Sequence, residues 1–132
     1  MQHWSQPMIT VDDVSASSAF WCDVLGAESG HGGDEYEQIV ADGEILLQLH
    51  HSGTEDHHGP LAEPGVRRGN GVLLWFEVAD FDGAVERIRR SGATIVRGPE
   101  VNPNAQQSEI WFGDPDGYTG VVAGESWWRP RA

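Results

Sequence analysis

The chain has 132 residues, which suits a single domain with a hydrophobic core of its own. Its 21 acidic residues outnumber its 8 lysines and arginines and give a formal net charge of −13, so we expect neither nucleic acid nor a membrane surface as a partner. No apolar run approaches the roughly 20 residues that cross a bilayer, and residues 1–7 lack the features of a secretory signal. The single cysteine, Cys22, permits no intrachain disulfide, and we expect a cytoplasmic protein.

The first half of the chain predicts a strand, a helix and three further strands. The strand is expected at Gln6–Val11, and apolar residues spaced four apart indicate the helix that follows. We expect Asp13 or Ser15 to cap the start of this helix and Gly26 to supply its left-handed end. An Asp-Gly turn at residues 42–43 is expected to join the last two strands.

The second half repeats this order. Its first strand is expected at Val72–Val78, whose nearly continuous apolar run is typical of a well-buried strand. A helix follows, capped by Asp80 or Asp82 and ended at Gly92, and arginines in its last turn favour the helix dipole. Three strands complete the half, with an Asp-Gly turn at residues 116–117.

The repeat predicts the domain organisation. Asp13 recurs as Asp80 and Gly26 recurs as Gly92, at separations close to half of the chain length. We expect one domain, residues 1–132, of the α+β class, built from two βαβββ modules at about residues 5–51 and 71–124. Residues 52–70, rich in Gly, Pro and His, are the expected linker.

Three segments resemble a known family. Residues 11–26, from Val-Asp-Asp-Val to Val-Leu-Gly, resemble the opening module of the vicinal oxygen chelate superfamily, and residues 75–82 resemble its second opening. Asp114–Tyr118 is similar to its C-terminal turn. This superfamily includes glyoxalase I, extradiol dioxygenases, fosfomycin-resistance enzymes and bleomycin-resistance binding proteins. The resemblance implies a cup-shaped, eight-stranded mixed sheet and a homodimer.

The resemblance also implies where a metal would bind. Family enzymes hold their metal at four strand positions inside the cup, which fall here at Gln6, Gln48, Leu73 and Val121. Apolar side chains do not bind a metal, and two neutral amides are weak ligands for a divalent ion. We therefore expect the usual metal site to be absent, together with glyoxalase-type isomerisation and extradiol ring cleavage, which both depend on a metal.

Further side chains line the implied cup, either by alternation from these four positions or, for Glu109 and Trp111, by the register that the resemblance implies. The candidate ligand-binding residues are Gln6, Gln48, His50, Leu73, Trp75, Glu77, Glu109, Trp111 and Val121. They form a mostly apolar surface with a few polar groups, which is the usual make-up of a small-molecule site. The two tryptophans either fill the core or stack on a ligand.

The ionisable residues have alternative interpretations. Glu77 and Glu109 are either solvated or bridged carboxylates, or they pair with a cationic ligand or transfer a proton. The candidate catalytic residues are His50, as a general base, and Glu109 beside it.

Four histidines at positions 50, 51, 57 and 58 form a further cluster. No spacing among them matches a known metal-ligand pattern, so a His-rich polar loop is the favoured interpretation. The alternative to a cofactor-free site is a divalent metal ion held by some of Gln48, His50, His57, His58 and Glu109.

The sequence thus favours a cofactor-free binding protein for an aromatic or cationic small molecule, similar to the bleomycin-resistance branch. The alternative is a metal-dependent lyase or dioxygenase with a shifted His/Glu site. A regulatory module without catalysis is a third hypothesis.

Overall fold

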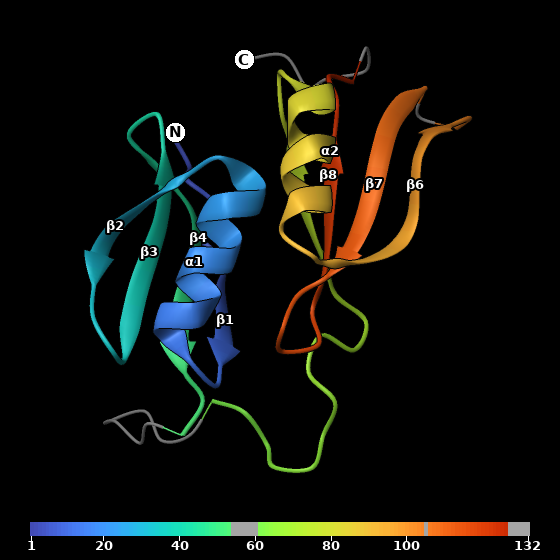
Figure 1. Ribbon diagram of the computed structural model, residues 1–132. Helices are drawn as coiled ribbons and strands as arrows, with labels where there is room; N and C mark the ends of the chain where they lie inside the picture. The colour runs from blue at the N-terminus through green and yellow to red at the C-terminus, as the bar shows by residue number, and fades with distance from the viewer. Residues whose placement is uncertain (54–60, 105, 127–132) are drawn as a thin grey trace. The chain divides into compact units, whose positions relative to one another are not determined.

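The computed structural model describes residues 1–53, 61–104 and 106–126 (Figure 1). The chain divides into two compact units, residues 1–68 and 69–132, and each contains one strand, one helix and three further strands. The elements in chain order are β1 (Met8–Val11), α1 (Val14–Leu25), β2 (Glu28–Gly32), β3 (Tyr36–Ala41), β4 (Glu44–His51), β5 (Leu73–Glu77), α2 (Phe81–Arg90), β6 (Thr94–Asn102), β7 (Gln107–Gly113) and β8 (Thr119–Ala123). The α+β class and the two βαβββ modules are confirmed; that the two sheets join into one cup stays a prediction.

The first unit is a four-stranded sheet in the order β1-β4-β3-β2, with α1 against one face. β1 pairs with β4 in parallel, and the other pairs are antiparallel. Trp21 and Val24 of α1 are fully buried, together with Val11, Leu47 and Leu49 of the sheet. These apolar side chains form the core of the first unit, because burial of apolar surface is the main driving force for folding.

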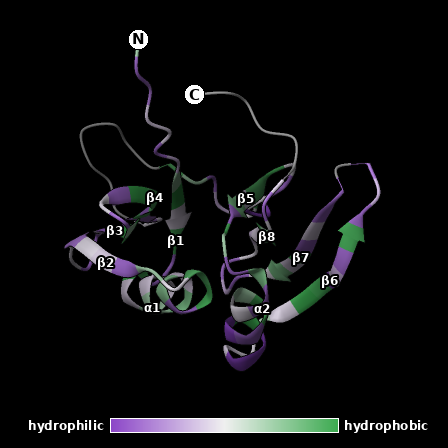
Figure 2. Cartoon of the chain, turned by 90° about the horizontal axis from the view of Figure 1, so that it is seen from above, coloured by the Kyte–Doolittle hydropathy of each residue, from purple (hydrophilic) through white to green (hydrophobic). Residues whose placement is uncertain are grey.

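The second unit has the same topology, in the order β5-β8-β7-β6, with α2 against β7 and β8. β5 pairs with β8 in parallel, and β7 pairs with both neighbours antiparallel. Its buried core includes Ile88 of α2 with Ile110, Phe112 and Val122. The helix lies on one face of its sheet, and much of it has the hydrophilic colour in Figure 2.

The helix ends follow local signals in the sequence. Of the two caps expected for each helix, the structure uses Asp13 for α1 and Asp80 for α2. The Asp13 carboxylate accepts from the backbone N–H of Ala16 at 2.9 Å, and the Asp80 carboxylate accepts from that of Gly83 at 3.0 Å. Gly26 ends α1 in the left-handed conformation, with φ of 63°.

Two predicted strands are shorter in the structure, and the one predicted at Val72–Val78 spans Leu73–Glu77. The predicted first strand, Gln6–Val11, begins in the structure at Met8, where pairing with Gln48 starts. Pro7 has no backbone N–H to donate to the ladder, although its carbonyl oxygen still accepts from the N–H of Gln48 at 2.8 Å. Neither helix in the described ranges is long and apolar enough to span a bilayer.

Each sheet has one face against its helix and a second face that we call the helix-free face. On the first unit, alternation places Ile9, Leu47 and Leu49 toward the helix, so Met8, Gln48 and His50 belong to the helix-free face. On the second unit, Phe112 and Val122 belong to the helix face, so Trp111 and Val121 belong to the helix-free face.

Candidate ligand-binding site

Two rows of side chains cross the helix-free face of the second unit. The aromatic row consists of Arg97, Trp111, Val121 and Trp75, one from each of β6, β7, β8 and β5 in register. The acidic row lies beside it and consists of Glu100, Glu109, Ala123 and Glu77. Because neighbouring strands lie about 4.8 Å apart, each row is a continuous strip across the sheet.

Two register shifts in β6 bring its charged residues onto this face. Ile95 pairs with Phe112 of the helix face, but Arg97 pairs with Trp111, which requires one extra residue in β6. A second extra residue lies between Arg97 and Glu100, whose partner is Glu109. Without these bulges, alternation could not place both Arg97 and Glu100 on the same face.

Glycine is required in the second bulge. Gly98 has φ of +84°, a conformation that L-residues other than glycine rarely adopt. A Cβ atom at this position would lie 2.5 Å from the backbone oxygen of Glu109. The bulge and the placement of Arg97 therefore depend on this glycine.

Glu109 lies buried at the centre of the acidic row, with 4% of its surface exposed. Its Oε1 accepts from Nε1–H of Trp111 at 3.0 Å, and its Oε2 accepts from Nδ2–H of Asn102 at 2.9 Å. Both carboxylate oxygens are thus engaged by uncharged donors, and one of these bonds fixes the orientation of the Trp111 indole.

Arg97 covers the ring of Trp111. Its guanidinium carbon lies 5.2 Å from the ring centroid, a cation–π distance, and its Nε donates to Glu100 Oε1 at 2.7 Å. A cavity of about 310 Å³ adjoins this group and is lined by Arg97, Glu100, Val101, Asn102, Pro103, Asn104, Glu109 and Trp111. The cavity therefore combines an aromatic ring with both signs of charge.

The β5 side of the face is more open, so the prediction of a well-buried strand here is wrong. Trp75 and Leu73 are 44% and 45% exposed, and Glu77 is exposed at the end of the strand. Val121 has no exposed surface, and its register partners on either side are Trp75 and Trp111. Val121 thus lies beneath this face and presents no surface to a ligand in this structure, whereas Trp75 presents nearly half of its side chain.

The helix-free face of the first unit carries a different group, a hydrogen-bonded network of amides and a phenol. The Tyr36 hydroxyl donates to Gln48 Oε1 at 2.5 Å and accepts from Gln38 Nε2–H at 3.1 Å. Gln48 Nε2–H donates to the backbone oxygen of Gln6 at 2.9 Å. The amide of Gln48 is therefore bonded at both its oxygen and its nitrogen.

His50 is nearly buried beside this network, with 9% of its surface exposed, and its Nδ1 lies 3.0 Å from the backbone oxygen of His51. It pairs across the sheet with Tyr36 on β3 and Thr10 on β1. His50 belongs to the first unit and Glu109 to the second, so the predicted catalytic pair stays a prediction.

The four family metal positions do not fit a divalent ion. Gln6 is exposed and contributes a backbone oxygen to the network, and the side-chain oxygen of Gln48 already accepts from Tyr36. Leu73 and Val121 have no donor atom. Within residues 1–53, 61–104 and 106–126, no three His, Cys, Asp or Glu side chains are grouped as a metal site would require. His57 and His58, which the alternative metal site uses, lie outside the described residues.

A second cavity, of about 590 Å³, lies in the first unit beside α1, β2 and the start of β3. Its lining is Ser15, Ser18, Ala19, Cys22, Ala27, Glu28, Ser29, Gly33, Asp34 and Glu37. Burial raises the pKa of the Cys22 thiol, and the nearby carboxylates of Glu37 and Glu28 act in the same direction. Cys22 is therefore expected to be a poor nucleophile at neutral pH.

Comparison with known proteins gives the family. The family model described as the Glyoxalase/Bleomycin resistance protein/Dioxygenase superfamily matches residues 3–121. The chain belongs to this superfamily. No curated protein sequence matches the chain.

Solved structures of the superfamily fold match nearly the whole chain. An integron cassette protein from the mobile metagenome of V. Cholerae is 24% identical with a TM-score of 0.71, and the match covers 96% of this chain and 97% of that one. Lactoylglutathione lyase from Agrobacterium tumefaciens is 20% identical with a TM-score of 0.70, covering 97% of both chains. The fosfomycin resistance protein FosX from Listeria monocytogenes is 15% identical with a TM-score of 0.69, covering 96% of both chains. At these identities the likeness shows the superfamily fold alone.

Several residues of these two faces were not predicted from the sequence. Tyr36 and Gln38 complete the network in the first unit, and Arg97, Glu100 and Asn102 surround Trp111 and Glu109 in the second. The Gly-Pro pair at positions 98–99 was the available signal, because these residues inside a strand indicate a bulge.

Proposed function

We propose that the chain is a binding protein of the superfamily whose ligand is an aromatic cation, held on the helix-free face of the second unit. One observation carries the proposal. The Trp111 indole is fixed by Glu109, and it already has a cation over its ring with the Glu100 carboxylate beside that cation. A ring for stacking and a carboxylate for charge are the two groups that recognise an aromatic cation.

The rest of the face supports the same chemistry. Trp75 presents a second, 44% exposed indole on the aromatic row, and Glu77 belongs to the acidic row next to it. The chain's net charge of −13 attracts cations over a longer range and so increases their local concentration. The four family metal positions carry two amides and two alkyl groups, which are weak ligands or none, and this favours binding without a metal.

The proposal includes the homodimer implied by the family, which sedimentation velocity at several protein concentrations tests. Ligand binding is tested by calorimetric titration with 1-methylquinolinium, an aromatic cation, and with its neutral isostere 1-methylnaphthalene. We expect the cation to bind and the neutral ring to bind at least several-fold more weakly. Equal affinity for the two probes, or no binding of the cation, would overturn the proposal.

Variants locate the site. Trp75→Ala is expected to weaken binding of 1-methylquinolinium by about three- to tenfold, the range of one stacking or cation–π contact. Trp4→Ala is the matched control, because Trp4 is a 64% exposed indole in the first unit and outside the proposed face. If the two variants bind the probe equally well, the ligand does not stack on Trp75.

The metal-dependent alternative is tested on chelator-treated protein. We expect that zinc, nickel, cobalt and manganese do not bind tightly at one ion per chain, because both polar atoms of the Gln48 amide are already bonded. Tight binding that is lost in a Gln48→Ala, His50→Ala double variant would contradict this expectation and would favour the lyase or dioxygenase hypothesis.

A further inference from the structure

We infer that Arg97 is an internal occupant of the ligand site, which a cationic ligand must displace from Trp111. This inference rests on the proposed function and adds a residue that controls the affinity of the same site. The reason is that Arg97 makes the same two kinds of contact as the proposed ligand. The Arg97 guanidinium makes an aromatic contact with Trp111 and an ion pair with Glu100, which are the two contacts that the proposed ligand needs.

The backbone of β6 is built to hold Arg97 in this place. Two bulges bring Arg97 and Glu100 to the helix-free face, and Gly98 between them has a conformation and a close approach that only glycine permits. Arg97 therefore lies directly opposite Trp111 as its cross-strand neighbour. If β6 continued from Ile95 without the first bulge, Val96 would pair with Trp111, and Arg97 would pair with Ile110 on the helix face.

The contacts of Arg97 are reversible. The side chains of Arg97 and Glu100 are 56% and 44% exposed, and ion pairs with this exposure are weak because solvent screens them. The guanidinium can thus leave the ring without unfolding the strand. When a site is competent only in a fraction of molecules, its apparent affinity falls by that fraction. Arg97 consequently lowers the affinity of the site and does not abolish binding.

The orientation of the Trp111 ring does not depend on Arg97. The Trp111 indole is fixed by its hydrogen bond to Glu109, and Glu109 is held in turn by Asn102. Because neither bond involves Arg97, removal of Arg97 leaves the ring in place and exposes the surface that the guanidinium covered. An arginine that oriented the ring would have the opposite effect when removed.

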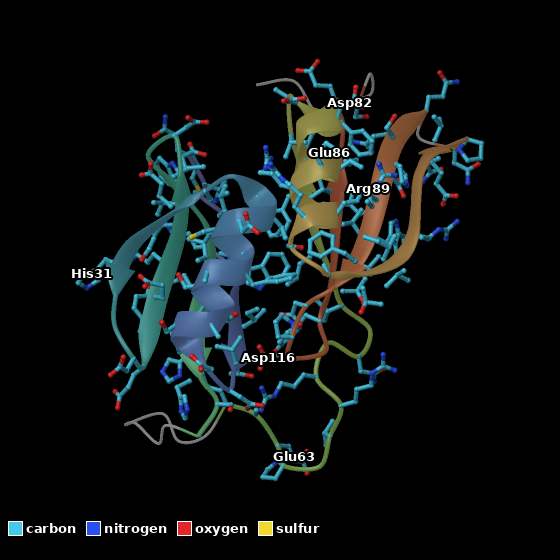
Figure 3. All side chains as sticks on the ribbon, in the orientation of Figure 1. His31, Glu63, Asp82, Glu86, Arg89 and Asp116 are labelled. Atoms are coloured by element: carbon cyan, nitrogen blue, oxygen red, sulfur yellow. The ribbon has the colours of Figure 1, made fainter. Side chains whose placement is uncertain are left out.

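The test measures binding of 1-methylquinolinium to the unmodified chain and to Arg97→Ala. We expect Arg97→Ala to bind the probe about fivefold more tightly, since one modest cation–π contact and one exposed ion pair no longer compete. The matched control is Arg89→Ala on α2. It removes the same charge from an exposed arginine that is also paired with a glutamate, Glu86 at 3.7 Å, on the helix of this unit (Figure 3).

A rise in affinity for Arg97→Ala that Arg89→Ala does not share supports the inference. If Arg89→Ala raises the affinity equally, the effect is long-range electrostatics and the inference is wrong. Equal or weaker binding by Arg97→Ala, with normal binding by the unmodified chain, also overturns it and leaves the proposed function standing. If neither the unmodified chain nor Arg97→Ala binds the probe, both proposals fail.

Two measurements address displacement directly. In the unmodified chain, the Arg97 side-chain protons are expected to lose their ring-current shift in NMR spectra when the probe saturates the site. In Arg97→Ala, guanidinium chloride at tens of millimolar is expected to weaken probe binding more than sodium chloride at the same ionic strength. Probe binding that leaves the Arg97 resonances unchanged shows that the two occupy different places, and it overturns the inference.

Discussion

The two units have the same topology and equivalent registers, yet their helix-free faces differ completely in chemistry. The first face carries amides and a phenol joined in one hydrogen-bonded network, and the second carries indoles, carboxylates and an arginine. By pairing register, Met8, Tyr36, Gln38 and Gln48 of the first unit correspond to Trp75, Glu109, Trp111 and Val121 of the second. Two sheets of the same strand order thus carry a hydrogen-bonded polar network in one unit and, in the other, the surface that we propose for an aromatic cation.

This difference shows that the duplicated fold alone does not determine the chemistry of its surface. In the first unit the polar atoms at the centre of the sheet bond to one another, which leaves little bonding capacity for a ligand. In the second unit the centre is Val121, and the rings beside it have faces that no hydrogen bond consumes. Four substitutions test how the two units differ, and they follow in order of decreasing expected effect.

The largest effect is expected from giving the second unit the residue of the first, Val121→Gln. Val121 is fully buried, so the amide would lose its hydration without a partner like Tyr36, at a cost of about 3 kcal/mol in the free energy of unfolding. Urea denaturation measures this change. The control is Leu73→Gln, a position 45% exposed on β5, where a change within about 0.5 kcal/mol is expected. Similar losses in both variants would mean that the difference in burial between the two positions does not determine the cost of the amide.

Gly98→Ala tests the bulge that the second unit has at the edge of its sheet. The positive φ and the approach of a Cβ to the Glu109 oxygen predict a loss of about 2 kcal/mol in stability. Gly43→Ala in the first unit is matched, because Gly43 has a similar φ of +78° with nothing within 4 Å of an added Cβ. It is expected to cost only the strain, about 1 kcal/mol, in the same denaturation assay. A larger loss at Gly43 than at Gly98 would show that the contact with Glu109 is unimportant.

The turns that join the last two strands of each unit differ in side-chain bonding. In the second unit, Asp114 Oδ1 accepts from the N–H of Asp116 at 3.0 Å and of Tyr118 at 2.7 Å, while burial raises the pKa of this carboxyl. Because the pKa of Asp114 is higher in the folded state, the folded state binds the proton of this carboxyl more tightly than the unfolded state does. The resulting contribution to folding stability is fully present below the ordinary pKa and is lost as pH rises through the folded pKa.

Asp114→Asn keeps an oxygen acceptor for both bonds and removes the buried charge. We therefore expect the stability of this variant relative to the unmodified chain to increase as pH rises from 3 to 7, by less than the Gly98→Ala effect. Denaturation at a series of pH values measures this trend. A relative stability that stays flat or falls over that range would contradict the assignment.

The smallest effect is expected at the ion pair that ties Arg68 to the first unit. Arg68 Nη2 donates to Asp12 Oδ1 at 2.6 Å, and this bond, with a further one from Ser52, lowers the pKa of Asp12. A lowered pKa gives stability above the ordinary value of 3.8, which is lost as pH falls through the folded pKa. Because Asp12 is 73% exposed, Asp12→Asn is expected to cost only about 0.5 kcal/mol at pH 7.

A double-mutant cycle with Arg68→Ala checks this assignment. The cost of Asp12→Asn at pH 7 is expected to disappear in the Arg68→Ala background and to shrink in the unmodified chain at pH 3. A cost that persists in both conditions would show that the ion pair with Arg68 is not its origin.

The sequence predicted most of the fold because the signals for it are local. The capping aspartates Asp13 and Asp80, the glycine after α1 and the two Asp-Gly turns each act within a few residues, and the structure uses them as expected. The start of β1 was placed two residues early, because the missing N–H of Pro7 outweighs the alternation of its neighbours.

The candidate site was less predictable because it depends on register between strands. Alternation from Leu73 and the family register placed Trp75 and Trp111 on one face, but the partners of Trp111 on β6 follow from two bulges that alternation does not describe. Tyr36 was missed for a similar reason, since its bond to Gln48 requires the pairing of β3 with β4. Residues whose role depends on a neighbouring strand are therefore the ones that one sequence reveals least.

The bulges of β6 also mean that the pairing of the backbone, and not only residue type, sets the composition of the proposed ligand face. Each extra residue reverses which side of the sheet the preceding residues address. If β6 paired without its bulges, Ile95 and Arg97 would share one side of the sheet, and Arg97 and Glu100 would lie on opposite sides, although no residue type had changed. The positions of bulges in this edge strand are thus a second means, besides residue substitution, of changing the side chains on the proposed ligand face.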